Sequence, residues 1–211
     1  IVIFATLCFI YIGYIYNDVI LGPTHNDFIT YRVLCDIDRY LHLGNRLCLQ
    51  QMHIRFQNME VSGQFMLSLT SSFMIGFIIS IPYILWEFWR FVKPALKPTE
   101  VKYTKGVVFW SSLLFFIGVF FAYFLIMPYA MTFFANYKIS TEFENIFTIQ
   151  SYLSMISQLV IGLGCVFELP ILVYFLSKVG ILTPDFLKKY RKQAILVIVV
   201  LAAFITPPDV T

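Results

Sequence analysis

Apolar residues are gathered in five runs along the chain, and polar residues fill the intervals between them. A helix that spans a bilayer needs about 20 mostly apolar residues. Three of the runs reach that length, and the first and last are shorter. We expect one transmembrane domain, residues 1–211, with an all-α fold: a polytopic membrane helical bundle. The pattern predicts helices over residues 1–16, 65–89, 106–127, 152–176 and 194–205.

The composition is that of a membrane protein. Of the 211 residues, 59% are hydrophobic and 13% are charged, and the mean hydropathy is +0.79. Soluble domains usually have about a quarter charged residues. There is no basic stripe and no nucleic-acid motif, so we predict no nucleic-acid partner. The chain begins inside an apolar run and ends at TPPDVT, so we expect a fragment that lacks an N-terminal segment and a last helix.

Basic residues are concentrated in two of the polar intervals. Residues 90–105 and 177–193 contain ten of the fifteen lysines and arginines. Loops rich in lysine and arginine normally stay on the cytoplasmic side of a membrane. We therefore predict that these two links and the N-terminus are cytoplasmic, and that segments 17–64 and 128–151 are outside. Helix-compatible repeats in 17–64 predict short helices on the membrane surface.

The cysteines give no indication of a metal site. The chain has four of them and no CxxC or HExxH pattern. Cys8 and Cys165 lie in apolar runs and are expected to be buried small hydrophobic residues. Cys35 and Cys48 share one polar segment, where they either pair in an oxidising compartment or remain free thiols. The chain also has no nucleophile–base pair and no phosphate loop, so we predict no cofactor, no metal and no enzyme activity.

An acidic residue lies inside the fourth apolar run, in the sequence GLGCVFELP. Helical spacing places Gly164, Ser157 and Ser154 on the same face as Glu168, with Gln158 beside them. An ionisable residue in a membrane helix is costly, and it normally faces a bundle interior or a wet cavity. Loss of water should favour its neutral form. Glu168 is then either a functional group that faces a partner helix or an internal tie between helices of this chain.

A second candidate lies in the first basic link, in the sequence FVKPALKPTEVKYTK. Its single acid, Glu100, can pair with an incoming guanidinium in a bidentate and geometrically selective way. The alternative is an ordinary surface salt bridge to Lys97 or Lys102, which contributes little. Spacing alone favours the salt bridge.

A third candidate is TPPD, which follows the last apolar run. Pro207 and Pro208 stop a helix, because proline lacks an N–H and clashes with the preceding turn. Asp209 then lies at the membrane boundary. Taken alone, this sequence is a helix terminator.

Five motifs occur in a fixed order along the chain. FVKPALKPTE follows the second predicted helix, FFIGVFFAYFLIMPYAMTFF closes the third, YLS opens the fourth, FELP lies within it, and TPPD follows the fifth. In this order they resemble the TatC family, the multi-spanning receptor subunit of the twin-arginine protein translocase. The resemblance covers about Phe65 to Asp209. It implies six helices, the last two short, in a concave, glove-like shape; about five of them are present here.

The resemblance also implies a function and a location. Members of the family receive twin-arginine signal peptides and form the core of a translocase that exports folded proteins, driven by the proton-motive force. The implied partners are single-helix subunits of the TatA and TatB kind, signal peptides of folded substrates, membrane lipid and further copies of the chain. The implied location is the bacterial cytoplasmic (inner) membrane. A different class of function, a proton-coupled small-solute transporter that uses Glu168, remains the alternative.

Site residues follow from matching the motifs. The resemblance implies that the signal peptide binds at Glu100, Phe91, Pro94 and Leu96. The intramembrane polar face for a partner helix consists of Glu168, Gln158, Ser157, Ser154 and Gly164. The outer edge consists of Asp209, Pro207 and Pro208. The family's N-terminal segment, which supplies a second acidic contact to the signal peptide, is missing from this sequence.

Overall fold

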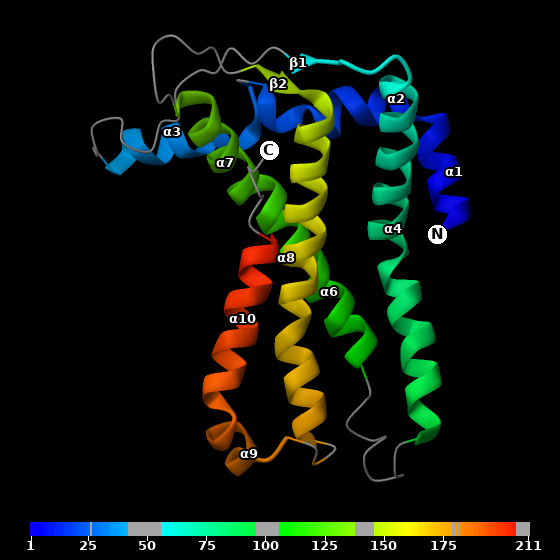
Figure 1. The fold of residues 1–211 in the computed structure, drawn as a ribbon, viewed down its shortest axis with the longest axis vertical. Helices are drawn as coiled ribbons and strands as arrows, with labels where there is room; N and C mark the ends of the chain where they lie inside the picture. Colours follow the sequence, from blue (N-terminus) through cyan, green and yellow to red (C-terminus); the bar gives the residue numbers. More distant parts are fainter. Residues whose placement is uncertain are drawn as a thin grey trace. The chain divides into compact units, whose positions relative to one another are not determined.

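The chain forms two compact units that consist mostly of helices. The structure, a computed structural model, describes residues 1–25, 27–41, 56–95, 106–137, 146–178, 180 and 182–205. Helices make up most of these residues (Figure 1), which confirms the predicted all-α class. Unit 1 contains Ile1–Phe77 and Phe120–Ser157, and unit 2 contains Ile78–Val119 and Gln158–Thr211. Each long apolar helix contributes residues to both units.

Three helices in the described part of the chain have the length and composition to cross a membrane. They are α4 (Gly63–Val92), α8 (Ile149–Lys178) and the continuous helix Val107–Asn136. Each has 30 residues. At 1.5 Å per residue this is about 45 Å, whereas the hydrocarbon core of a bilayer is about 30 Å thick. The ends of each helix can therefore reach beyond the hydrocarbon.

The third predicted helix, 106–127, continues to Asn136 in the structure. Pro128 lies in the first turn of α7 and has no N–H to donate, and the Phe124 carbonyl in the preceding turn accepts a hydrogen bond from the Thr30 hydroxyl at 2.6 Å. The wider π-helical turn before it relieves the crowding that a proline ring causes in an α-helix. The beginning of the predicted outer segment 128–151 is therefore helical. The whole helix consists of α6 (Val107–Phe121), the π-helical turn Ala122–Ile126 and α7 (Met127–Asn136).

The first predicted helix, 1–16, is broken at Tyr11, whose backbone has φ −99° and ψ 15°. The two arms, Val2–Ile10 and Ile12–Ile20, meet at 81° (Figure 1). Gly13 lies just beyond the break, and glycine is a poor helix former, so little helical stability is lost there. The segment consists of α1 (Val2–Ile10), α2 (Ile12–Ile15), a π-helical turn (Tyr16–Ile20) and a 3-10 turn (Gly22–Thr24).

Three tyrosine hydroxyls hold the irregular turns after the break, and two of them come from parts of unit 1 more than a hundred positions away. Irregular turns leave backbone carbonyls without helical partners, and a buried carbonyl needs a donor. Gly22 is required beside them, because a Cβ there would lie 2.8 Å from the Tyr123 hydroxyl oxygen. The donors Tyr123, Tyr152 and Tyr31 bond the carbonyls of Val19, Ile20 and Pro23 at 2.5, 2.6 and 2.7 Å.

The remaining part of unit 1 contains α3 (Ile29–Leu41) and two short strands. The strands β1 (Phe56–Gln57) and β2 (Phe147–Thr148) pair in parallel. The Gln150 side chain donates a hydrogen bond to Glu60 Oε2 at 3.1 Å, and this bond supports the pairing. The strands are too short to change the fold class.

Unit 2 ends in α9 (Pro184–Lys189) and α10 (Arg191–Ile205). The Thr183 hydroxyl caps α9 by accepting a hydrogen bond from the Phe186 N–H at 3.2 Å. The predicted fifth helix, 194–205, corresponds to α10 and begins earlier than predicted, at Arg191. The residues before Ala194 are basic and amide side chains that favour a helix.

The expectation that Cys8 and Cys165 are both buried is correct for Cys8 and wrong for Cys165. Cys8 is buried, but Cys165 is exposed on the chain surface. Cys165 follows Gly164 on α8, so it lies about 100° around the helix axis from Gly164, which contacts α6. Cys35 is disulfide-bonded. Cys48 lies outside the described residues.

We predict that Tyr152→Phe lowers the free energy of unfolding by about 1–3 kcal/mol, because the buried carbonyl of Ile20 loses its donor. Denaturant titration of the purified protein in detergent micelles measures the change. Tyr83→Phe is the matched control, since the Tyr83 hydroxyl bonds Glu87 on the exposed surface. Equal effects of the two substitutions would contradict a specific role for the Tyr152 bond.

Candidate functional site

In unit 2, α6 and α8 approach each other through glycines. A Cβ at Gly118 of α6 would lie 2.9 Å from the Leu163 carbonyl oxygen of α8. A Cβ at Gly164 of α8 would lie 2.7 Å from the Phe115 ring of α6. Neither distance leaves room for a side chain. Small residues allow helix backbones to approach closely in a membrane, so the glycines fix the register of this helix pair.

The close contact brings Ser111 of α6 to Glu168 of α8. The Ser111 residue is 3% exposed, and its hydroxyl hydrogen-bonds the Glu168 carboxyl. The Oε1 atom of that carboxyl is buried and has no hydrogen-bond partner among the described residues. Glu168 is thus tied to a helix of its own chain through one contact, and it keeps a polar atom that a further group could satisfy.

The other residues of the predicted polar face have different surroundings. The Ser157 hydroxyl lies 2.8 Å from the sulfur of Met74 on α4, within unit 1. Ser154 is exposed and Gln158 is half-buried. Gly164 is closed off by the Phe115 ring. The structure therefore brings Gly164 and Glu168 together at α6, and it gives Ser157 a partner on α4.

The end of α4 carries exposed aromatic residues. Phe91 is 82% exposed, and Trp86 and Phe88 are about half exposed. Pro94 is exposed in the 3-10 turn Lys93–Ala95 that follows. The predicted site residues that lie outside the described part of the chain are Leu96, Glu100, Pro207, Pro208 and Asp209.

A small set of contacts that we did not predict from the sequence holds this end of α4. The Trp89 ring packs edge-on against Phe175 of α8, with centroids 4.4 Å apart. The Arg90 guanidinium lies 5.7 Å from the centre of the Trp86 ring and 3.9 Å from Glu87. The three-residue spacing of Glu87 and Arg90 was a readable signal for their pair.

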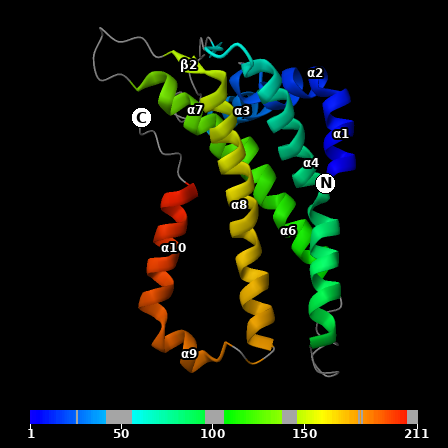
Figure 2. The ribbon, with the colours of Figure 1, turned by 45° about the vertical axis from the view of Figure 1, so that its right-hand side comes forward.

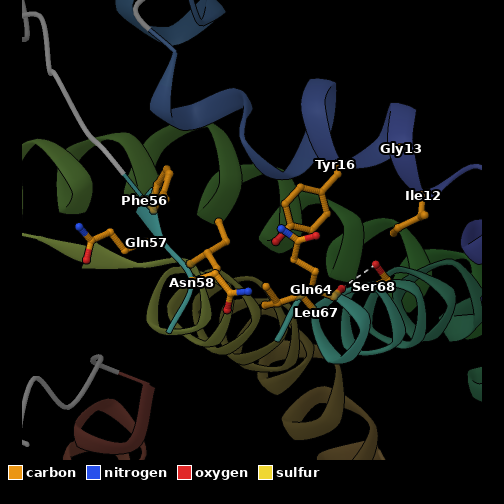
Figure 3. A pocket seen from close by; sticks show the side chains of 10 residues that line it. Ile12, Gly13, Tyr16, Phe56, Gln57, Asn58, Gln64, Leu67 and Ser68 are labelled. Atoms are coloured by element: carbon orange, nitrogen blue, oxygen red, sulfur yellow. Dashed lines mark hydrogen bonds between the residues drawn. The ribbon is translucent and has the colours of Figure 1, made fainter. Parts of the chain in front are cut away.

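Unit 1 contains a recess of about 420 Å³. Side chains of Tyr16 and of Gln64 on α4 point toward one another in it (Figure 3). The Tyr16 hydroxyl is buried and has no hydrogen-bond partner among the described residues. The described lining has no charged side chain, so the recess suits neutral groups. The lining consists of Ile12, Gly13, Tyr16, Phe56, Gln57, Asn58, Gln64, Leu67, Ser68 and Ile149.

The sequence profile of the family described as "Sec-independent protein translocase protein (TatC)" matches residues 1–211. This chain belongs to the TatC family. A TatC protein of Blattabacterium sp. subsp. Periplaneta americana (strain BPLAN) is 39% identical over 197 residues, which are 93% of this chain and 74% of that protein. The TatC protein of Campylobacter jejuni is 36% identical over 151 residues, 72% of this chain. The chain spans 62% of that relative, less than two thirds of its length.

Solved TatC structures share the fold. A crystal structure of the twin-arginine translocase receptor TatC matches with a TM-score of 0.70 at 27% identity, over 99% of this chain and 81% of that one. A second, of the receptor in DDM, matches with a TM-score of 0.73 at 27% identity, over 99% of this chain and 82% of that one. Together with the apolar helices, TatC membership makes the chain a multi-pass membrane protein and a core subunit of the twin-arginine translocase. The comparisons give no support to a small-solute transporter.

We predict that Gly118→Ala lowers the free energy of unfolding by about 1–3 kcal/mol, because its methyl group meets the α8 backbone and the helices must separate. Thermal unfolding in detergent measures the change. Gly13→Ala is the control, since a Cβ there meets nothing within 4 Å. A Gly118→Ala protein as stable as the control would contradict the tight α6–α8 contact.

Proposed function

We propose that this chain is the signal-peptide receptor of a twin-arginine translocase that exports folded proteins, driven by the proton-motive force. The observation that carries the proposal is the match of the TatC family over residues 1–211. The match includes FVKPALKPTE, which begins with the last two residues of α4 and continues into the link. The chain does no covalent chemistry in this scheme; it binds and assembles.

The proposed orientation follows from charge. Basic residues concentrate in the links 90–105 and 177–193, which therefore lie in the cytoplasm. The N-terminus is then cytoplasmic as well, and the membrane is the bacterial inner membrane. A signal peptide made in the cytoplasm meets the end of α4 first. The receptor surface thus lies on the side where its ligand is synthesised.

Recognition combines one charged and several apolar contacts. Glu100 receives the paired arginines, because a carboxylate binds a guanidinium through two parallel hydrogen bonds. Phe91 is 82% exposed, and Pro94 is exposed beside it, so both offer apolar surface to a peptide. Leu96 extends the same surface along the sequence. The exposure of Phe91 supports this role, since an exposed large aromatic at the end of a helix is a common anchor for binding.

The second proposed surface receives a partner helix of the TatA or TatB kind. Glu168 is its centre, because its Oε1 atom is buried and has no partner among the described residues. A polar group on an incoming helix gains a hydrogen bond there, worth about 1 kcal/mol in a membrane. Gln158 and Ser154 lie along the same helix and add polar contacts, whereas Gly164 and Ser157 already contact Phe115 and Met74 of this chain. In this scheme Asp209, after Pro207 and Pro208, belongs to the outer edge.

We predict that Glu100→Ala and Glu100→Gln each reduce crosslinking of a twin-arginine signal peptide to the link by at least about tenfold, since a buried or clamped charge pair contributes more than 1.4 kcal/mol. The full chain is used, in the membrane. Site-specific photocrosslinking and export of a folded reporter are measured in the same cells.

Glu87→Gln is the matched control for Glu100, because Glu87 is another acid at the end of α4 and already pairs with Arg90. It should leave both readouts within about twofold of the wild type. If the Glu100 variants crosslink and export normally at a normal membrane level, Glu100 is an ordinary surface charge.

We predict that Glu168→Leu lowers assembly with the partner helix by about fivefold, whereas Glu168→Gln keeps most of it, because glutamine retains hydrogen bonding. The exposed native Cys165, one turn before Glu168, reports assembly through disulfide crosslinking to a cysteine in the partner helix. Val173→Leu, an exposed apolar exchange on α8, is the control. Unchanged crosslinking in Glu168→Leu would make Glu168 an internal tie alone.

A further inference from the structure

α3 presents a continuous apolar stripe on its exposed side. At about 100° per residue, the four residues of the stripe fall within an arc of about 80°. Exposed apolar residues that are scattered singly need no explanation, but a contiguous stripe marks a contact surface. The stripe consists of Ile29, Val33, Ile37 and Tyr40, which are 62%, 49%, 42% and 86% exposed.

The other two faces of α3 are already accounted for. Tyr31 and Asp38 are 6% and 2% exposed and face the protein. Burial raises the pKa of Tyr31 to about 12, as expected for a hydroxyl removed from water. Arg39 and Asp36 form an ion pair at 3.7 Å with side chains that are 83% and 71% exposed. This charged face lies beside the apolar stripe, so the exposed half of the helix is amphipathic along its length.

α3 is joined to a membrane-spanning helix at its start. The Thr30 hydroxyl donates a hydrogen bond to the Phe124 carbonyl at 2.6 Å, and the Phe28 ring stacks on the Phe124 ring at 5.6 Å. Phe124 lies in the π-helical turn of the span Val107–Asn136. Its neighbours on that span, Phe120 and Leu125, are 57% and 41% exposed. The element that carries the stripe is thus attached to a part of the span that also exposes large apolar side chains.

The direction of α3 fits a helix in the plane of the bilayer. Within unit 1, α3 runs across the direction of the first turns of α8, and both views agree on this (Figures 1 and 2). A helix with a narrow apolar face and a charged face lies in the boundary between headgroups and acyl chains. Tyrosine is enriched at that depth, and arginine can reach the lipid phosphates from it.

We infer that α3 is an interfacial anchor: Ile29, Val33, Ile37 and Tyr40 insert into the headgroup–acyl boundary of the leaflet in which α4 begins. Arg32 and Arg39 lie on the headgroup side. The ligand of this surface is bilayer lipid. The inference needs only a membrane-spanning chain, so it stands or falls independently of the receptor function proposed above.

A photoreactive benzoylphenylalanine at Tyr40 tests the anchor. The probe is larger than tyrosine, but Tyr40 is 86% exposed, so the added benzoyl group projects into the surroundings and leaves the fold intact. A second probe position is Val33, and the matched control is Arg39 on the charged face. The full chain is reconstituted in phosphatidylethanolamine–phosphatidylglycerol vesicles with radiolabelled acyl chains. After illumination, we expect at least about fivefold more lipid adduct at Tyr40 and Val33 than at Arg39.

Three outcomes would overturn the inference. Equal lipid adducts at the stripe and at Arg39 would mean that α3 does not lie at the boundary. An adduct to another peptide of the same chain would mean that the chain covers its own stripe. A band of twice the chain mass would mean that a second copy covers it. Each variant must elute from size-exclusion chromatography like the wild type.

Discussion

Polar groups that are removed from water must find partners within the protein, and this constraint governs the structure. In a membrane a backbone carbonyl without a donor is expensive, so irregular backbone occurs only where other groups satisfy it. The bent segment after Tyr11 meets this condition through hydroxyls that belong to other elements of unit 1. The bend is therefore a property of the packed unit. The residues of the bend alone would not hold it.

The same constraint operates in unit 2, where it depends on close packing. Gly118 and Gly164 let α6 and α8 meet without side chains between them. That approach brings the Ser111 hydroxyl to the Glu168 carboxyl. A larger residue at either glycine would separate the helices and leave the Glu168 carboxyl without its hydrogen-bond partner. The acid therefore depends on the glycines, because the close approach of α6 and α8 brings it the Ser111 hydroxyl.

Helix existence could be predicted from the sequence, but helix ends could not. Long apolar runs indicate segments that lie in lipid, and a single segment in lipid must be helical, so the runs predicted the all-α class. The helix end beyond Pro128 depends on a π-helical turn, and the irregular turns after the break at Tyr11 are bonded by Tyr123 and Tyr152, more than a hundred positions away. Such long-range partners leave no periodic trace. Glu168 could be predicted as a candidate because an acid inside an apolar run is visible in the local sequence. Its partner Ser111 could not be predicted, because it lies on another helix.

Under the proposed function, the two hypotheses for Glu168 are complementary. An internal tie uses one hydrogen-bonding contact of the carboxyl, and Ser111 supplies it. The buried Oε1 atom has no such partner among the described residues. A group that was wholly internal would be expected to satisfy both oxygens, because the same packing that buries them could have supplied a second hydroxyl. The tie holds the acid at a fixed position on the helix pair, and under the proposed function its second oxygen is the atom that a polar group of the partner helix satisfies.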